Sequence, residues 1–445
     1  MTGPAKAQRP PLVLEAVIES LSHDGRGVAR PDGKATFVHG ALPGERVRLR
    51  LAKRHRNFDE AELDAVLEPS PARVAPACPV FGRCGGCTLQ HLAAEAQIAS
   101  KQQALLDALR HIGRLEPETV YPPLVGPSSW GYRRKARLGV KHVAKKGRVL
   151  VGFRERGSGF ITETASCPVL HPKVGHLLGP LGELIGGLSR PECVPQVEVA
   201  MGDADGILAF RFLAPPTLGD LDALVAFGRR HAVAAYVQEG GLDTLRPVEP
   251  PGLTLTYALP EFDCALEFRP GDFTQVNFEV NRLMVSRALD LLAPRAQERV
   301  LDLFCGLGNF TLPLARQAAE AVGVEGEAAL VTRARANAER NGIANARFLT
   351  GDLYRGLDAA PWLDAGPFDC ALLDPPRTGA IEILEYLPRL GVGRILYVSC
   401  YPATLARDAA ELVQRHGYRL AGAGVMDMFP HTAHVESMAL FIRDR

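Results

Sequence analysis

The C-terminal part of the chain alternates short apolar runs with segments whose apolar residues recur at helical spacing. The apolar runs fall near residues 300–305, 321–325, 346–350, 368–374, 394–399, 418–425 and 437–442. Continuous apolar runs of this length are typical of strands buried on both faces, and strands that alternate with helices form α/β sheets. We therefore predict a Rossmann-like, seven-stranded α/β sheet in a domain of residues 269–445.

The first of these strands leads into a glycine turn. Residues 300–304 are followed by Cys305-Gly-Leu-Gly-Asn309 and then by helical spacing over 310–319. The two glycines let a ligand approach the backbone, and Glu325 follows at about the 20-residue spacing of a carboxylate that binds a ribose. Asn309 and Phe310 replace the third glycine of a dinucleotide-binding turn. This departure favours S-adenosylmethionine over NAD as the cofactor.

The N-terminal region is predicted to be a small β-barrel of the oligonucleotide-binding kind, over residues 12–70. Residues 12–18 and 35–38 are strand-like, and three glycine-containing turn signals separate the strands. A basic run crosses this region with only Glu45 as an acid, and it consists of Arg46, Arg48, Arg50, Lys53, Arg54 and Arg56. A charged edge strand is the alternative, but so one-sided a charge favours RNA phosphates. Residues 1–11 are Pro/Ala-rich, and we expect a disordered tail.

Three closely spaced cysteines begin the central region of residues 71–268. Cys78, Cys84 and Cys87 lie in a glycine-rich loop, a pattern in which thiolates hold zinc or an iron–sulfur cluster. A structural zinc site usually has a second Cys-x-x-Cys pair. Here the nearest candidate for a fourth ligand is Cys167, a single distant cysteine followed by proline, which suits a [4Fe–4S] cluster better. A helix over 89–112 is expected to connect the loop to the larger domain and to pack on it.

A second basic segment follows in the central region. Between Trp130 and Arg156 there are ten Lys or Arg and one acid, Glu155, whereas residues 270–445 carry 18 basic and 21 acidic residues. Basic side chains interleaved with aromatic rings favour RNA over a merely solvated hairpin. The candidate RNA-binding residues here are Trp130, Tyr132, Arg133, Arg134, Lys135 and Arg137. Residues 190–268 are less informative, with strands near 197–200 and 207–212 and a helix over 221–231.

Composition adds bounds rather than a function. The chain has 51 basic and 50 acidic residues, so its net charge indicates no partner. No apolar run reaches the ~18 residues of a membrane span, and no signal-peptide pattern begins the chain. We therefore expect a cytoplasmic protein, in which nine cysteines are not a disulfide set.

Chemically active side chains follow the ends of the predicted strands. Asp352 and Asp374 follow two of them, and Cys400 ends the strand at 394–399, immediately before a helix. A thiol at a helix N-terminus is expected to have a lowered pKa and to be a good nucleophile. Glu436, between apolar residues before the last strand, is a candidate general base. Alone, each could be a structural thiol or a capping acid, but ligands of such sheets bind where these strand ends meet.

Together these residues resemble the bacterial RNA (uracil-carbon-5)-methyltransferases, in the form that carries a TRAM domain and a [4Fe–4S] cluster and acts on 23S rRNA. The resemblance covers residues 12–443. Its motifs are the cysteine loop, Trp130-Gly-Tyr-Arg-Arg134, Phe273-Thr-Gln-Val-Asn277, the glycine turn, Leu373-Asp-Pro-Pro-Arg377, the segment after Val398 and Met426-Asp-Met-Phe-Pro-His-Thr-Ala-His-Val-Glu-Ser437. Tyr401 departs from the family, which usually has Asn there.

The resemblance implies roles for individual residues. It implies Cys78, Cys84, Cys87 and Cys167 as ligands of the cluster, Cys400 as nucleophile and Glu436 as base. Around S-adenosylmethionine or the target base it implies Gln275, Phe304, Gly306, Gly308, Asn309, Glu325, Asp352 and Asp374. The implied substrate is a single-stranded or flipped-out uridine of 23S rRNA, methylated through a covalent adduct between the cysteine and carbon 6. A monomer that acts on RNA, with no DNA or membrane partner, is expected.

Other functions stay open at this point. A DNA cytosine methyltransferase would share the thiolate, but its nucleophile follows a proline, and no cysteine of this chain does. A non-catalytic RNA-binding iron–sulfur protein would not need Cys400 and Glu436 beside a cofactor turn. A redox enzyme would use its cluster in catalysis. Within the family, another rRNA uridine or a tRNA is the alternative substrate.

Overall fold

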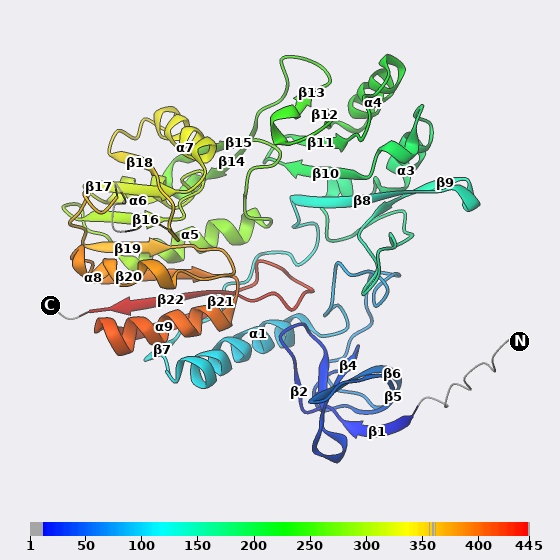
Figure 1. Cartoon of the computed structure of the whole chain (residues 1–445), viewed down its shortest axis with the longest axis horizontal. Coiled ribbons are helices and arrows are strands. Elements are labelled where there is room, and N and C mark those ends of the chain that lie inside the picture. Colours follow the sequence, from blue (N-terminus) through cyan, green and yellow to red (C-terminus); the bar gives the residue numbers. More distant parts are fainter. Residues whose placement is uncertain (1–11, 356, 358–359, 361, 444–445) are drawn as a thin grey trace, which may run out of the picture. The chain divides into compact units, whose positions relative to one another are not determined.

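The computed structural model describes residues 12–355, 357, 360 and 362–443, which form two compact units (Figure 1). The first unit contains the chain up to Ser100 together with His431–His434, and the second contains Lys101–Pro430 and Val435–Arg445. The tail expected at residues 1–11 lies outside the described residues.

The first unit is built on a six-stranded sheet. Its strand order is β1 (Val13–Val17), β5 (Arg46–Arg54), β6 (Phe58–Glu68), β4 (Ala35–His39), β3 (Gly27–Ala29) and β2 (Ser20–Leu21). Alternate residues of β5 point inward, and Val47 and Leu49 join Ile18, Val38 and Ala61 in a small apolar core. The alternation follows from the period of two along a strand, and it leaves the arginines of β5 on the outer face.

The first sheet of the second unit also has six strands. Their order is β13 (Arg246–Pro247), β12 (Ala234–Gln238), β11 (Gly206–Arg211), β10 (Gln196–Met201), β8 (Lys135–Val143) and β9 (Arg148–Gly152). Helices α2 (Pro172–Gly175), α3 (Leu178–Gly186) and α4 (Leu218–His231) accompany it. The predicted helix at 221–231 begins earlier, because Thr217 and Asp220 form a capping box.

The main sheet of the second unit has eight strands. Their order is β18 (Ala346–Thr350), β17 (Glu320–Glu325), β16 (Arg299–Leu303), β19 (Cys370–Leu373), β20 (Arg394–Ser399), β22 (Glu436–Ile442), β21 (Arg419–Met426) and β7 (Thr119–Val120). All seven predicted strands are present. The count of seven is corrected by β7, a two-residue edge strand parallel to β21, which is too short to leave an apolar pattern.

Helices cover both faces of this sheet. Leu396 and Val398 of β20 share one core with α5 (Phe278–Leu292), α6 (Thr311–Gln317) and α7 (Ala328–Arg340). Tyr397, between them, points to the other face and donates to Asp408 Oδ2 of α9 (Pro402–His416) at 2.6 Å. Short helix α8 (Tyr386–Arg389) precedes β20. The buried strands therefore have two apolar faces, which explains their unbroken apolar runs.

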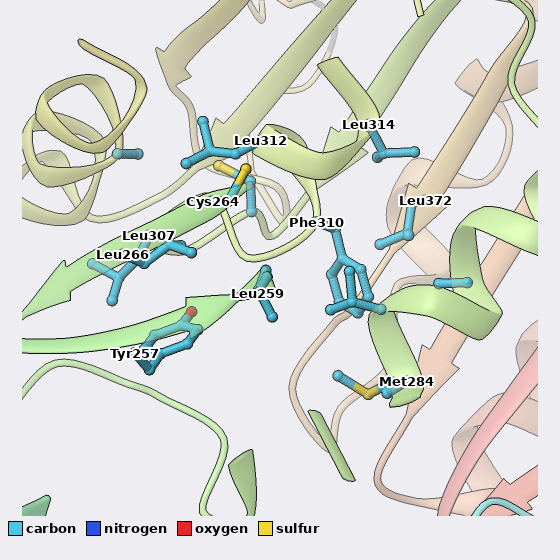
Figure 2. Close-up of a cluster of buried hydrophobic side chains, with 14 of the residues drawn as sticks. Tyr257, Leu259, Cys264, Leu266, Met284, Leu307, Phe310, Leu312, Leu314 and Leu372 are labelled. Atoms are coloured by element: carbon cyan, nitrogen blue, oxygen red, sulfur yellow. The ribbon is translucent and has the colours of Figure 1, made fainter. Parts of the chain in front are cut away.

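The hairpin of β14 (Leu255–Leu259) and β15 (Cys264–Phe268) packs into the same core. Figure 2 shows Tyr257, Leu259 and Leu266 beside Leu307 and Phe310 of the glycine turn. Because this core continues across residue 268, no separate central domain is found, and the predicted boundaries at 70/71 and 268/269 differ from the two units described.

The expected connecting helix is shorter than predicted. Helix α1 spans Ala94–Ala108 and continues as a single π turn over Leu109–Gly113. The π turn packs on α9 so closely that a side chain at Gly113 would meet the carbonyl oxygen of Ala406 at 2.8 Å. The predicted packing on the larger domain is thus confirmed for this end of the helix.

Candidate active site

The register of the main sheet brings Cys400 and Glu436 together. Strands β20 and β22 are antiparallel, and Ser399 pairs with Ser437. Cys400 follows Ser399 and Glu436 precedes Ser437, so they lie opposite each other at the end of the ladder. Ser437 Oγ donates to the carbonyl oxygen of Ser399 at 3.1 Å and holds this end of the ladder together.

The Glu436 carboxyl is buried beside other charged groups. Only 6% of the residue is exposed. Burial raises the pKa of Glu436 to about 8, and the neighbouring Asp374 raises this pKa too, while Arg377 and Lys101 lower it. A carboxyl with a pKa near neutral pH accepts a proton far more readily than an ordinary glutamate, as a general base requires.

Asp374 stands at the end of the neighbouring strand. It follows β19, and its N–H donates to the carbonyl oxygen of Leu303 at 3.3 Å. Part of its surface reaches solvent, but the surrounding protein atoms remove most of its hydration and raise the pKa of Asp374 to about 7. Deeper in β16, full burial raises the pKa of Asp302 to about 8, although Thr311 donates to its Oδ2 at 2.5 Å.

The expectation of a lowered thiol pKa is wrong for Cys400. The residue does precede α9, whose N-cap is Tyr401 and whose first residue is Pro402. However, burial, Glu436 and Asp374 together raise the pKa of Cys400 to about 11, although Arg377 lowers it. Desolvation and two nearby carboxylates outweigh the helix terminus, so the thiol is the resting form.

The glycine turn has the predicted shape. Gly306 and Gly308 have φ values of +54° and +91°, and the space on the side-chain side of Gly306 is open. Phe304 also has a positive φ, +65°, which is uncommon for a residue with a side chain and is typical of strained functional backbone. Its ring lies 5.8 Å from that of Tyr354. The backbone here is shaped for the close approach of a ligand.

Glu325 ends β17 and faces the turn. Its Oε2 accepts a hydrogen bond from Gly306 N at 3.1 Å, and its Oε1 accepts one from Glu327 N at 3.0 Å. The carboxylate is only partly buried, and each oxygen has a further lone pair. Glu325 can therefore shape the turn and still accept the hydroxyls of a sugar.

Other predicted cofactor residues differ in how they are used. The Asn309 amide exchanges two hydrogen bonds with Asn281, at 2.9 and 3.0 Å, and accepts one from Tyr257 at 3.0 Å, so it joins the turn to α5 and β14. Asp352 is exposed, and its Oδ1 accepts from Tyr354 N at 2.8 Å. Gln275 is half-buried in the segment before α5.

The cysteine loop consists of turns. Cys84 Sγ accepts a hydrogen bond from Gly86 N at 3.4 Å, as a thiolate ligand does, and Cys78 N donates to Gln90 Oε1 at 3.2 Å. Cys87 and Cys167 are also half-buried. Within the described residues, no three His, Cys, Asp or Glu side chains are gathered closely enough to hold a metal ion. The donor atoms suit a cluster, but their arrangement does not test it.

The basic run on β5 has acidic neighbours that the sequence did not reveal. The strand extends to Arg54, so Lys53 and Arg54 are not in a loop. Arg46 lies 3.9 Å from Glu15 and 3.3 Å from Glu68, and Arg48 lies 3.8 Å from Glu15. Glu45 takes no part, because it is fully buried and paired with Arg73. Exposed pairs of this kind are weak and leave the arginines available to phosphates.

The second basic segment divides into internal and exposed residues. Arg134 donates to the Gly202 carbonyl oxygen at 2.5 Å, and Lys135 donates to the Asp272 carbonyl oxygen. Tyr132 is 7% exposed and donates to the Pro430 carbonyl oxygen at 3.0 Å, so its ring is not available for stacking on a base. Trp130 and Arg133 are half-buried, and Arg137 is exposed on β8.

Two side chains at the site were not singled out from the sequence. Arg377 is exposed, and its guanidinium lies 5.9 Å from the ring of Tyr401, so the unusual tyrosine is in contact with it. Phe273 is 68% exposed, just before Gln275. A large exposed aromatic ring within a motif was the available signal. None of the helices in the described part of the chain is long and apolar enough to cross a membrane.

Comparisons with known proteins agree with this site. A family model described as tRNA (Uracil-5-)-methyltransferase matches residues 260–444, and a TRAM domain model matches residues 13–63. The chain is 58% identical to the 23S rRNA (uracil(1939)-C(5))-methyltransferase RlmD of Alkalilimnicola ehrlichii, over 99% of each protein. It is 54% identical to the RlmD of Nitrosococcus oceani, over 98% of each.

A solved structure has the same fold. The Pyrococcus abyssi tRNA (uracil-54, C5)-methyltransferase, solved in complex with S-adenosyl-L-homocysteine, matches with a TM-score of 0.74 at 24% identity, over 96% of this chain and 100% of that chain. The predicted Rossmann-like methyltransferase fold and the TRAM domain are thus confirmed. With a thiol and a buried carboxyl opposite each other at the strand ends, the chain belongs to the RlmD family of S-adenosylmethionine-dependent RNA (uracil-C5)-methyltransferases.

Proposed function

We propose that this chain methylates carbon 5 of a uridine in 23S rRNA, the one that the names of its relatives give as uracil 1939. The observation that carries the proposal is the placement of Cys400 opposite Glu436 at the end of the β20–β22 ladder, beside Asp374. A nucleophile and a base are the two groups that this substitution requires.

The chemistry explains the two residue types. Carbon 5 of uracil is a poor nucleophile, and addition of the Cys400 thiolate to carbon 6 makes an enolate in which carbon 5 is activated. S-adenosylmethionine supplies the electrophilic methyl group when it is bound. Glu436 then accepts the proton of carbon 5, the carbon 5–carbon 6 double bond re-forms, and the carbon 6–sulfur bond breaks to release Cys400.

We assign the cofactor to the glycine turn and the strand ends around it. Gly306 and Gly308 allow its close approach, and Glu325 accepts the ribose hydroxyls. Gln275, Phe304, Asp352 and Asp374 complete the set around the cofactor or base. Asn309 acts through position, because its amide is already used to hold the turn.

RNA contact is assigned to the outer faces of two strands. Arg46, Arg48 and Arg50 project from β5, and Arg137 and Lys141 project from β8. Such residues bind phosphates without reading sequence. Trp130 and Arg133 remain candidates, whereas Arg134 and Lys135 have internal partners and are expected to hold the segment in shape.

We also propose that Cys78, Cys84, Cys87 and Cys167 hold a [4Fe–4S] cluster. The proposal rests on the number and spacing of the thiols and on the backbone N–H that Cys84 Sγ already accepts. No catalytic step depends on it.

Covalent trapping tests the proposed function. Cys400→Ala should be inactive and form no adduct with 23S rRNA, because the first bond cannot form. Glu436→Gln should add to the base and accept the methyl group, then accumulate a protein–RNA adduct that survives denaturing gels. A 23S rRNA fragment and a tRNA, each carrying 5-fluorouridine, should be trapped unequally by the native chain, with the rRNA preferred.

Three outcomes would contradict the proposal. An active Cys400→Ala variant would remove the thiolate mechanism and with it the uracil assignment. Normal turnover of Glu436→Gln without an adduct would transfer the role of base to another group, with Asp374 the next candidate. Preferential trapping of tRNA would overturn the rRNA assignment and leave the chemistry intact.

A further inference from the structure

Lys101 is an ammonium group buried in the second unit. Its side chain is 2% exposed, and Nζ donates to Asp427 Oδ1 at 2.7 Å and to the carbonyl oxygen of Phe429 at 2.9 Å. Burying a lysine costs several kcal/mol unless partners compensate, and an apolar residue would often fill the same space more cheaply. Burial lowers the pKa of Lys101, and Asp427 opposes this effect. So costly a group calls for a role beyond packing.

The pair lies beside the catalytic carboxyl. In the β21–β22 ladder Met426 is opposite Glu436, and Asp427 is the next residue along the chain. The charges of Lys101 and Glu436 act on each other, because Lys101 lowers the pKa of Glu436 and Glu436 raises the pKa of Lys101.

The other charged groups around Glu436 come from neighbouring elements. Asp374, after β19, raises the pKa of Glu436, and Arg377, in the loop that follows, lowers it. Cys400, after β20, has its own pKa raised by Glu436. Of the two cations, Arg377 is exposed to solvent, which screens its charge, whereas Lys101 is buried. Lys101 is therefore the cation whose position is fixed.

We propose that Lys101, held by Asp427 and the Phe429 carbonyl, is a positioning residue that stabilises the Glu436 carboxylate for removal of the carbon-5 proton. The inference rests on the proposed function. In the step concerned, the carbon 5–hydrogen bond breaks and the proton passes to a Glu436 oxygen. The electron pair left on carbon 5 forms the carbon 5–carbon 6 double bond, and the carbon 6–sulfur pair leaves with Cys400 as the thiolate. Lys101 touches neither the base nor the sulfur.

The role predicts a defect in one step only. Lys101→Met removes the charge and keeps a long apolar chain. Elimination should slow by about tenfold near pH 7, with its pH inflection about one unit higher, because one pKa unit is a factor of ten in the carboxylate fraction. A 5-deuterated substrate uridine should react more slowly than the protonated one, and this isotope effect should exceed that of the native chain. Trapping by 5-fluorouridine RNA does not involve elimination, and it should keep its native rate.

Two further variants separate this role from a structural one. Lys101→Arg retains the charge and should restore the native pH inflection. Lys173→Met, which removes an exposed lysine that donates to the Ala204 carbonyl oxygen, should match the native chain in every measurement. Asp427→Asn keeps the lysine but removes its counter-ion, and it should shift the inflection in the same direction as Lys101→Met.

Several results would overturn the inference. A native pH profile and isotope effect in both Lys101→Met and Asp427→Asn would do so, as would equal losses of trapping and elimination, which indicate a general structural defect. If the native chain itself formed no adduct with 5-fluorouridine RNA, the proposed function would fail first, and the inference would fall with it.

Discussion

The burial of Glu436 predicts a pH-dependent stability that can be measured without substrate. Its pKa rises from the usual 4.5 to about 8 in the folded chain. Between these two values the folded state retains a proton that the unfolded state has lost. The free energy of unfolding therefore falls as pH rises through this window, by about 1.4 kcal/mol per pH unit from this group alone.

The glutamine variant isolates this contribution. Glu436→Gln has nothing to ionise, so its stability relative to the native chain should improve as pH rises. The full difference of 8 minus 4.5 units corresponds to roughly 4–5 kcal/mol, complete above the folded pKa and absent below the unfolded one. Asp302 and Asp374 have pKa values raised by burial as well, but they are present in both proteins and cancel in the comparison.

Urea unfolding followed by tryptophan fluorescence is the assay. Both tryptophans, Trp130 and Trp362, belong to the second unit, and Trp362 is fully buried, so the signal reports the unit that contains Glu436. Glu385→Gln removes an exposed carboxylate and controls for the loss of one negative charge. A difference between native and Glu436→Gln that stays constant within ~0.5 kcal/mol from pH 5 to 9 would refute the desolvation of this carboxyl.

Three more predictions concern the cofactor, the RNA and the cluster. Glu325→Ala should weaken S-adenosylmethionine binding about tenfold or more, because a buried sugar hydroxyl pair loses its acceptor, and unchanged affinity in calorimetry would remove the ribose role. Neutralising three exposed cations of β8 and the turn after it should weaken RNA binding and flatten its salt dependence by about 0.7 per lost phosphate contact, and a native slope would mean merely solvated charges; the residues are Arg137, Lys141 and Lys145. Anaerobically purified protein should be brown with about four irons per chain, whereas stoichiometric zinc without visible absorbance would contradict the cluster.

The sheet could be predicted because its signal is local. Each central strand is apolar on both faces, since helices cover both sides, and each run is long enough to stand out. Strand β7 has two polar-to-apolar residues at the sheet edge and leaves no such signal. The single core that joins the β14–β15 hairpin to the glycine turn depends on contacts between distant segments, so the boundary at 268/269 could not be read correctly.

The site was predictable in its residues more than in its electrostatics. Cys400 and Glu436 follow from strand order and motif, because the ends of β20 and β22 meet at one edge. The thiol pKa does not follow, since the helix-terminus rule is local while burial and the carboxylates come from the fold. Lys101 and Asp427 are 326 residues apart in sequence, and nothing near either one indicates the other.

The raised pKa values at the strand ends lead to a last prediction, on proton release. Glu436 and Asp374 have pKa values of about 8 and 7, and the Cys400 pKa is about 11, so burial and mutual repulsion keep these groups largely protonated near neutral pH. A cation bound beside them favours their ionised forms and lowers their pKa values. S-adenosylmethionine carries a sulfonium, whereas the sulfur of S-adenosylhomocysteine is neutral.

Binding of S-adenosylmethionine near pH 7.5 should therefore release protons, up to about one per chain, and binding of S-adenosylhomocysteine should release fewer. Calorimetric titration in buffers of different ionisation enthalpy measures this number directly. The difference between the two ligands should shrink in Glu436→Gln, which has one titrating carboxyl fewer. Equal proton release by both ligands would mean that the sulfonium does not act on these groups. The thiol would then have to be activated by the RNA or by another residue, since the resting site holds it protonated.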